Sequence, residues 1–163
     1  MLPLVAEDQH YFQCVRVPAT NEQKDFDDLV LGLTKILIDS LNEKALDSLI
    51  SPNSRVDLKG SIDRLEAALI ARSVTGYQEH IEFLRKLQLL RSSGSAHRKG
   101  SNYRKTAEEF GVNKINLRSV FQGILERAIC ALDYLTSIAR GGLLTSVTSE
   151  TKPTGPSQKE ALE

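Results

Sequence analysis

The side chains best suited to chemistry lie in one short basic stretch of this 163-residue chain. Arg91 and His97 are separated by five residues, in a segment whose serines and glycines show no helical or strand periodicity. An imidazole with an ordinary pKa of about 6.5 can move protons near neutral pH. A guanidinium can hold two phosphate oxygens and offset the negative charge that develops on a phosphodiester. Because RNA carries its own nucleophile, the 2′-hydroxyl, such a pair could act on it without a metal.

Further polar side chains around this pair could position a polynucleotide. They are Ser92, Arg98, Lys99 and Tyr103. One histidine supplies only half of an acid–base pair. Two copies of the site, brought together in a homodimer, would complete it.

The formal net charge is zero, but the charges are unevenly distributed. Residues 20–50 carry seven acidic side chains against three lysines, a net charge of −4. Residues 83–107 carry seven basic side chains and no acidic one, a net charge of +7. Such a basic block is expected at a phosphate-binding surface. The alternative is an exposed basic face that pairs with the acidic segment or with a partner.

Helices are predicted to carry this stretch, because apolar residues recur every three or four positions. The pattern covers residues 23–49, 61–73, 77–90 and 115–140, with a shorter helix at 103–110. In the segment 77–90 the apolar stripe consists of Ile81, Leu84, Leu87 and Leu90. Pro52 interrupts the pattern after the first helix, and Gly141 with Gly142 ends the last. We therefore predict an all-α fold, a bundle of four or five helices.

The bundle is predicted to span residues 21–140. Residues 1–20 are expected to form an extended lead-in. Residues 141–163 are rich in Ser, Thr, Pro and Gly, and we expect a disordered, flexible tail or linker. The abrupt start and the linker-like end suggest a module with further domains in a longer protein.

A resemblance follows from where the arginine and histidine stand in this bundle. The sequence LRKLQLLRSSGSAHRKGSNY, residues 84–103, lies between the third and the last long helix. Over about residues 21–140 this arrangement resembles the HEPN family (higher eukaryotes and prokaryotes nucleotide-binding domain). That family combines an all-helical bundle with an Arg-(four to six residues)-His motif in this region.

The resemblance implies RNA as the partner, a homodimer, and metal-independent endoribonuclease activity in prokaryotic antiviral or toxin–antitoxin systems, with no cofactor. It assigns Arg91 to phosphate charge stabilisation and His97 to proton transfer. Two positions depart from the pattern, Ser92 and Gly94, and Gly94 makes the segment between the arginine and the histidine less helical. Active members often carry Asn, Asp or His directly after the arginine, where this chain has Ser92. Many members of the family bind RNA or dimerise without cleaving.

Two other interpretations remain open. Residues 106–120 fit a helix-turn-helix motif, with Ala107 and Gly111 four positions apart and apolar residues at suitable places. The helix beginning near Asn113 would then enter the major groove of DNA, with Arg118 on its exposed face. Alternatively, the bundle is a non-catalytic dimerisation or interaction module of a larger protein.

The composition also indicates in which cellular compartment the protein is expected. The apolar runs are far shorter than the roughly 20 residues that a membrane span needs, and residues 1–20 lack the features of a signal peptide. We therefore expect a cytoplasmic protein with no membrane partner. Cys14 and Cys130 are predicted to be buried thiols, since two cysteines favour a reducing compartment. His80 is predicted to be an exposed helical residue without a metal.

Overall fold

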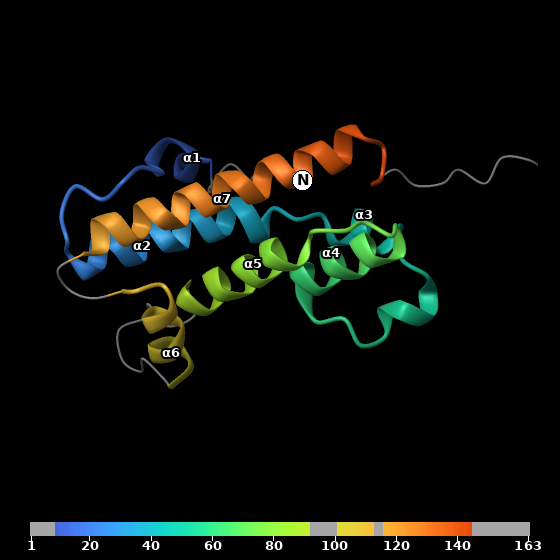
Figure 1. Cartoon of the computed structure of the whole chain (residues 1–163), viewed down its shortest axis with the longest axis horizontal. Coiled ribbons are helices and arrows are strands. Elements are labelled where there is room, and N and C mark those ends of the chain that lie inside the picture. Colours follow the sequence, from blue (N-terminus) through green and yellow to red (C-terminus); the bar gives the residue numbers. More distant parts are fainter. Residues whose placement is uncertain (1–8, 92–100, 113–115, 145–163) are drawn as a thin grey trace, which may run out of the picture.

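The computed structural model describes residues 9–91, 101–112 and 116–144. Within these ranges every regular element is helical (Figure 1), which confirms the all-α class. The elements are α1 (His10–Cys14), α2 (Gln23–Thr34), the π-helical turn η2 (Lys35–Asp39), α3 (Glu43–Asp47), the 3₁₀ turn η3 (Pro52–Arg55), α4 (Gly60–Ala71), α5 (Gln78–Arg91), α6 (Ser101–Glu109) and α7 (Leu117–Arg140). None of the described helices is long and apolar enough to cross a membrane.

The core lies where α2, α5 and α7 meet. Figure 1 shows α7 running beside α2, with α3 and α4 towards one end of the molecule and α6 towards the other. Phe26 of α2 and Phe121 of α7 are fully buried and pack edge to face, with ring centroids 6.0 Å apart. Phe83 of α5 is also buried, at 2% exposure, although it lies outside the predicted apolar stripe.

Four of the predicted helices are confirmed, with boundaries shifted by at most about two residues: α4, α5, α6 and α7. Each buries one face, and the predicted stripe of α5 is buried throughout. α7 ends where the glycine pair predicts. Gly142 adopts a φ of +74°, and the Leu143 N–H donates to the Ile138 carbonyl at 3.2 Å. This left-handed turn satisfies carbonyls that the end of the helix would leave unpaired.

The predicted single helix over residues 23–49 is wrong. The chain leaves the helix after the π-helical turn, and α3 begins as a separate helix. The cause is Asn42, whose side-chain oxygen accepts a hydrogen bond from the Ala45 N–H at 3.0 Å and so caps α3. Apolar periodicity does not reveal the break, because Leu41 and Leu46 are buried on both sides of it.

The prediction of an extended lead-in over residues 1–20 is wrong at residues 10–14, which form α1. Tyr11 packs directly over Gly32 of α2. A Cβ atom at position 32 would lie 2.8 Å from Cδ1 of Tyr11, closer than atoms can approach. The absence of a side chain at Gly32 therefore lets α1 dock. Residues 1–8, and residues 145–163 of the predicted tail, lie outside the described ranges.

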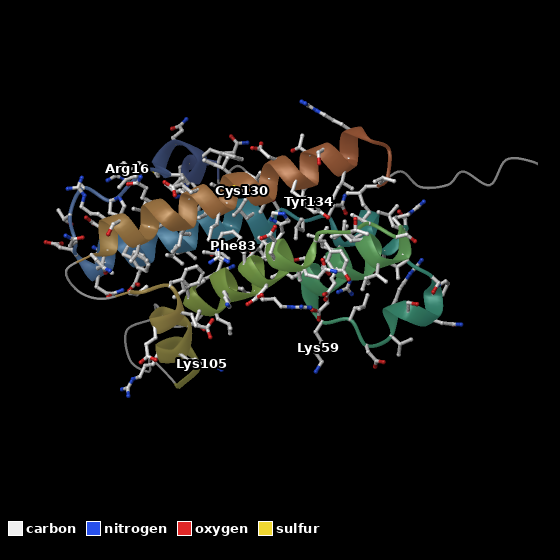
Figure 2. The ribbon with its side chains drawn as sticks, in the orientation of Figure 1. Arg16, Lys59, Phe83, Lys105, Cys130 and Tyr134 are labelled. Atoms are coloured by element: carbon white, nitrogen blue, oxygen red, sulfur yellow. The ribbon has the colours of Figure 1, made fainter. Side chains whose placement is uncertain are left out.

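Two expectations about single side chains are corrected. Cys14 of α1 and Cys130 of α7 are exposed rather than buried; Figure 2 labels Cys130. The His80 side chain is only 14% exposed, because its ring stacks on Tyr134 at a centroid distance of 4.3 Å. Periodicity places His80 beside the apolar stripe of α5, but does not show that α7 covers it.

Candidate functional site

Arg91, the last residue of α5, forms an ion pair with a residue 52 positions earlier. Its Nη1 donates to both carboxylate oxygens of Asp39, each at 2.8 Å. The Arg91 side chain is 30% exposed and that of Asp39 37% exposed, so the pair lies at the surface. Helix α5 has brought the candidate phosphate-binding arginine against the end of the π-helical turn.

Asp39 uses only one of the three guanidinium nitrogens. Neither Nε nor Nη2 of Arg91 forms a hydrogen bond with any residue that the structure describes. These two nitrogens form the edge with which a guanidinium grips two oxygens of a carboxylate or phosphate at once. The edge of Arg91 that suits a phosphate is therefore not used by the ion pair.

The π-helical turn determines where Asp39 lies. Its wider turn places three successive residues, Ile36, Leu37 and Ile38, in the core and leaves Asp39 as the exposed end. The buried Ser40 that follows donates its hydroxyl to the Ile36 carbonyl at 2.6 Å. Short π-helical segments are rare and occur frequently at functional sites.

A groove of about 720 Å³ opens beside Asp39. Its walls come from the start of α3, the start of α4 and Gln88 of α5. The polar residues that line it include Asn42, Ser61 and Gln88. The Ser61 hydroxyl donates to the Ile38 carbonyl at 3.2 Å, which ties α4 to the π-helical turn. Its charged lining residues are Asp39, Glu43 and Lys44, and Arg91 does not line it.

Other members of the basic block are paired with acids of the bundle. Nη2 of Arg85 contacts both Asp63 and Glu66 of α4, at 2.8 and 2.6 Å. These hydrogen bonds raise the pKa of Arg85, and the bond from Arg85 is the main cause that lowers the pKa of Asp63. Arg85 thus pairs within the molecule, with acids of α4 that lie outside the acidic segment 20–50.

Lys86 is paired in the same way. Its ammonium lies 2.6 Å from Glu82 and 3.0 Å from Glu109 of α6. The two hydrogen bonds raise the pKa of Lys86, that from Glu82 first. The contact with Glu109 joins α5 to α6. Lys86 therefore contributes to helix packing.

On α6 the block continues with Arg104 and Lys105, which are both exposed (Figure 2 labels Lys105). Neither forms an ion pair with a described carboxylate. Together with the free edge of Arg91, these two side chains are the basic groups of the block that remain open to a ligand, within the described ranges.

The structure places only part of the predicted site. Ser92, His97, Arg98 and Lys99 lie outside the described residues. Tyr103 lies within α6, but its side chain is not among those described. The proposed convergence of Arg91 with His97 therefore stays a prediction. Asp39 belongs to the acidic segment 20–50, so its ion pair with Arg91 is of the kind that the alternative interpretation of the basic block expects, although that interpretation named no partner. The one available signal was a single charge inside the apolar run 36–41.

The alternative helix-turn-helix region has two helices in the expected order, α6 and α7. Gly111 has a φ of +69°, and the Asn116 side chain donates to its carbonyl at 2.9 Å, which closes the connection. However, α6 packs mainly against α5, and its buried residues include Thr106 and Ala107. Asn113 lies outside the described residues. DNA binding by this region stays a prediction.

No cluster of three His, Cys, Asp or Glu side chains in the described part of the chain could hold a metal ion. Comparison with protein-family models, with curated proteins and with solved structures finds no match.

Proposed function

We propose that this chain is a HEPN-like RNA-binding domain in which Arg91 contacts a backbone phosphate. The observation that carries the proposal is that Asp39 holds Nη1 of Arg91, while the Nε/Nη2 edge forms no hydrogen bond within the described ranges. A phosphate can accept two parallel hydrogen bonds from this edge. The exposed Arg104 and Lys105 add positive charge on the neighbouring helix, as a polynucleotide site requires.

The contrast with Arg85 supports the choice of Arg91. One nitrogen of Arg85 faces two carboxylates, so the local net charge there is −1 if all three groups are ionised. Arg91 faces one carboxylate, which gives a local net charge of zero and leaves an unused donor edge. An incoming phosphate is repelled at the first position and finds hydrogen-bond donors at the second.

The same proposal assigns catalysis to His97, in a metal-independent endoribonuclease of a prokaryotic defence or toxin system. His97 would take the proton of the RNA 2′-hydroxyl or protonate the leaving oxygen, while Arg91 stabilises the charge on the phosphate. A cytoplasmic homodimer would place two such sites together, and further domains would select the RNA. No cofactor enters this scheme. Ser92, Arg98, Lys99 and Tyr103 are proposed to position the substrate.

Arg91→Ala tests the binding step, with Arg85→Ala as the matched control from the same helix. For a fluorescent single-stranded RNA, we expect Arg91→Ala to raise the Kd by about 5- to 30-fold, roughly 1–2 kcal/mol. Its slope of log Kd against log salt should fall by about 0.7, the value for one phosphate contact. Arg85→Ala should change the Kd by less than about 2-fold. Equal losses in the two variants would contradict a specific contact at Arg91.

Incubation of labelled RNA in excess chelator tests the catalytic step. We expect wild-type protein to cleave, and His97→Ala to cleave about 10²- to 10⁴-fold more slowly, because it lacks the proton-transfer group. If wild type and variant cleave equally, or neither cleaves, the enzymatic assignment fails. RNA binding that still depends on Arg91 would then leave a non-catalytic binding module.

DNA binding is the second candidate, because Arg118 is exposed on the first turn of α7. Duplex DNA should bind wild type and lose affinity on Arg118→Ala, but not on Arg91→Ala, if the helix-turn-helix interpretation is correct. RNA binding sensitive to Arg91 would favour the first candidate. Binding of neither nucleic acid would leave the dimerisation or interaction module.

A further inference from the structure

We infer that Asp39 is a positioning residue for Arg91, which holds the guanidinium so that its Nε/Nη2 edge faces the RNA phosphate. This inference rests on the proposed function and adds a residue to the same site. It begins from the way in which the two side chains meet.

Both oxygens of Asp39 lie 2.8 Å from the same nitrogen, Nη1. A carboxylate that only neutralises an arginine favours the two-nitrogen fork, in which two parallel hydrogen bonds form. Asp39 leaves that fork open. The contact thus restrains the torsions of the Arg91 side chain without occupying the groups that a phosphate needs.

Asp39 is itself firmly placed. The three residues before it are buried, and the carbonyl of Ile38 accepts a hydrogen bond from Ser61 of α4. The hydroxyl of Ser40, on its other side, donates to the Ile36 carbonyl. The π-helical turn therefore presents a carboxylate from a rigid backbone, which is what a positioning group requires.

Arg91, in contrast, has no other restraint on its guanidinium among the described residues. A long side chain that is free in the unbound protein must lose its rotamer freedom when RNA binds. If Asp39 has already removed that freedom, RNA binding is stronger, even though the carboxylate offsets part of the positive charge. This predicts that the hydrogen bond at position 39 matters more than the negative charge.

Asp39→Ala and Asp39→Asn separate these two contributions, because the amide oxygen of Asn can still accept from Nη1. We expect Asp39→Ala to raise the Kd for single-stranded RNA by about 2- to 10-fold. Asp39→Asn should retain wild-type affinity within about 2-fold, or bind slightly more tightly. Asp28→Ala is the matched control, since it removes an exposed acid of the same acidic segment that has no partner among the described residues. It should change the Kd by less than about 2-fold.

A double-mutant cycle shows whether Asp39 acts through Arg91. In an Arg91→Ala background, we expect Asp39→Ala to change the Kd by less than about 2-fold. The same loss in both backgrounds would overturn the inference, as would unchanged binding by Asp39→Ala. Tighter binding by Asp39→Ala would also overturn it, because Asp39 would then compete with the phosphate.

An RNA-free measurement distinguishes failure of this inference from failure of the proposed function. In ¹⁵N–¹H spectra, the Nη1–H signal of Arg91, assigned by its loss in Arg91→Lys, should be separated from those of freely moving arginines, because Nη1 is the nitrogen that Asp39 contacts. It should move into their envelope in Asp39→Ala and stay separated in Asp39→Asn. A signal that does not respond to Asp39→Ala overturns the positioning role. Wild-type protein that binds no RNA overturns the proposed function, whatever this signal shows.

Discussion

Residues 78–86 of α5 and its last turn differ in how they use charge, although Arg85 and Arg91 belong to the same basic block. In residues 78–86, side chains of neighbouring helices contact the His80 ring and the Arg85 guanidinium. His80 stacks on Tyr134 of α7, and Arg85 contacts two acids of α4. The Phe83 ring is covered by Arg127, whose guanidinium carbon lies 5.0 Å from the ring centroid.

At the last turn, Arg91 contacts a single carboxylate, and two of its nitrogens form no hydrogen bond with the residues that the structure describes. This difference shows that basic residues which are close together in the sequence need not form one ligand-binding surface. Each basic residue becomes a packing group or a ligand-binding group according to the number of acids that the fold brings to it. The predictions below test whether residues 78–86 of α5 are structural, as this comparison requires.

The largest effect is expected from Phe83→Ala. The side chain is 2% exposed, and its removal leaves a cavity under Arg127. We expect the free energy of unfolding to fall by about 3–5 kcal/mol, as measured by urea denaturation. Leu89→Ala is the control on the same helix, because Leu89 is 43% exposed, and it should cost less than about 1 kcal/mol. Similar losses in the two variants would show that Phe83 does not hold the core.

An intermediate effect is expected from Tyr134→Phe. The Tyr134 hydroxyl donates to the Thr75 carbonyl at 2.7 Å and so ties α7 to the connection between α4 and α5. The variant keeps the ring that stacks on His80 and loses only this hydrogen bond, at a cost of about 1 kcal/mol in thermal or urea unfolding.

The control for Tyr134→Phe is Tyr77→Phe, because the Tyr77 hydroxyl has no hydrogen-bond partner in the part of the chain described. Its cost should be smaller. RNA affinity should be unchanged in both variants, since neither residue lies at the last turn of α5. A loss of RNA affinity in Tyr134→Phe would contradict the division of α5 into two parts.

The smallest effect concerns the pH dependence of stability at Asp63. Hydrogen bonds from Arg85, and then from the Lys59 N–H, lower the pKa of Asp63 in the folded protein. A lowered pKa adds stability that is present above the unfolded pKa of about 3.9 and is lost as the pH falls through the folded value. For a partly exposed pair, this contribution is at most about 1 kcal/mol at neutral pH.

Asp63→Asn isolates this contribution. The difference in unfolding free energy between wild type and variant should be constant from about pH 7 to about pH 5, and should shrink towards zero as the pH falls below about 3.9. Urea titrations across this range measure it. A difference that does not depend on pH would show that the charge of Asp63 contributes nothing.

Much of the fold could be predicted from the sequence, because most of its helices bury one continuous face. The apolar spacing of residues 61–73, 77–90 and 115–140 gave the positions of α4, α5 and α7. The breaks were harder to predict. Asn42 caps the start of α3 through a single hydrogen bond, and the predicted helix over residues 23–49 is divided there. α1 forms in the lead-in where Tyr11 packs against Gly32, which has no side chain. The spacing of apolar residues predicts neither a side-chain cap nor the packing of an aromatic ring on a glycine.

Likewise, one part of the candidate site could be predicted from the sequence and another part could not. The sequence predicts a helix over residues 77–90 directly before Arg91, since helical periodicity and the loss of apolar residues after Leu90 are local properties; the structure extends this helix to include Arg91. The sequence does not show that Arg91 contacts Asp39, while Arg85 contacts Asp63 and Glu66. The physical reason is that an ion pair depends on which helix faces approach one another. Residues 52 positions apart are brought together by packing, which charge counts along the chain do not encode.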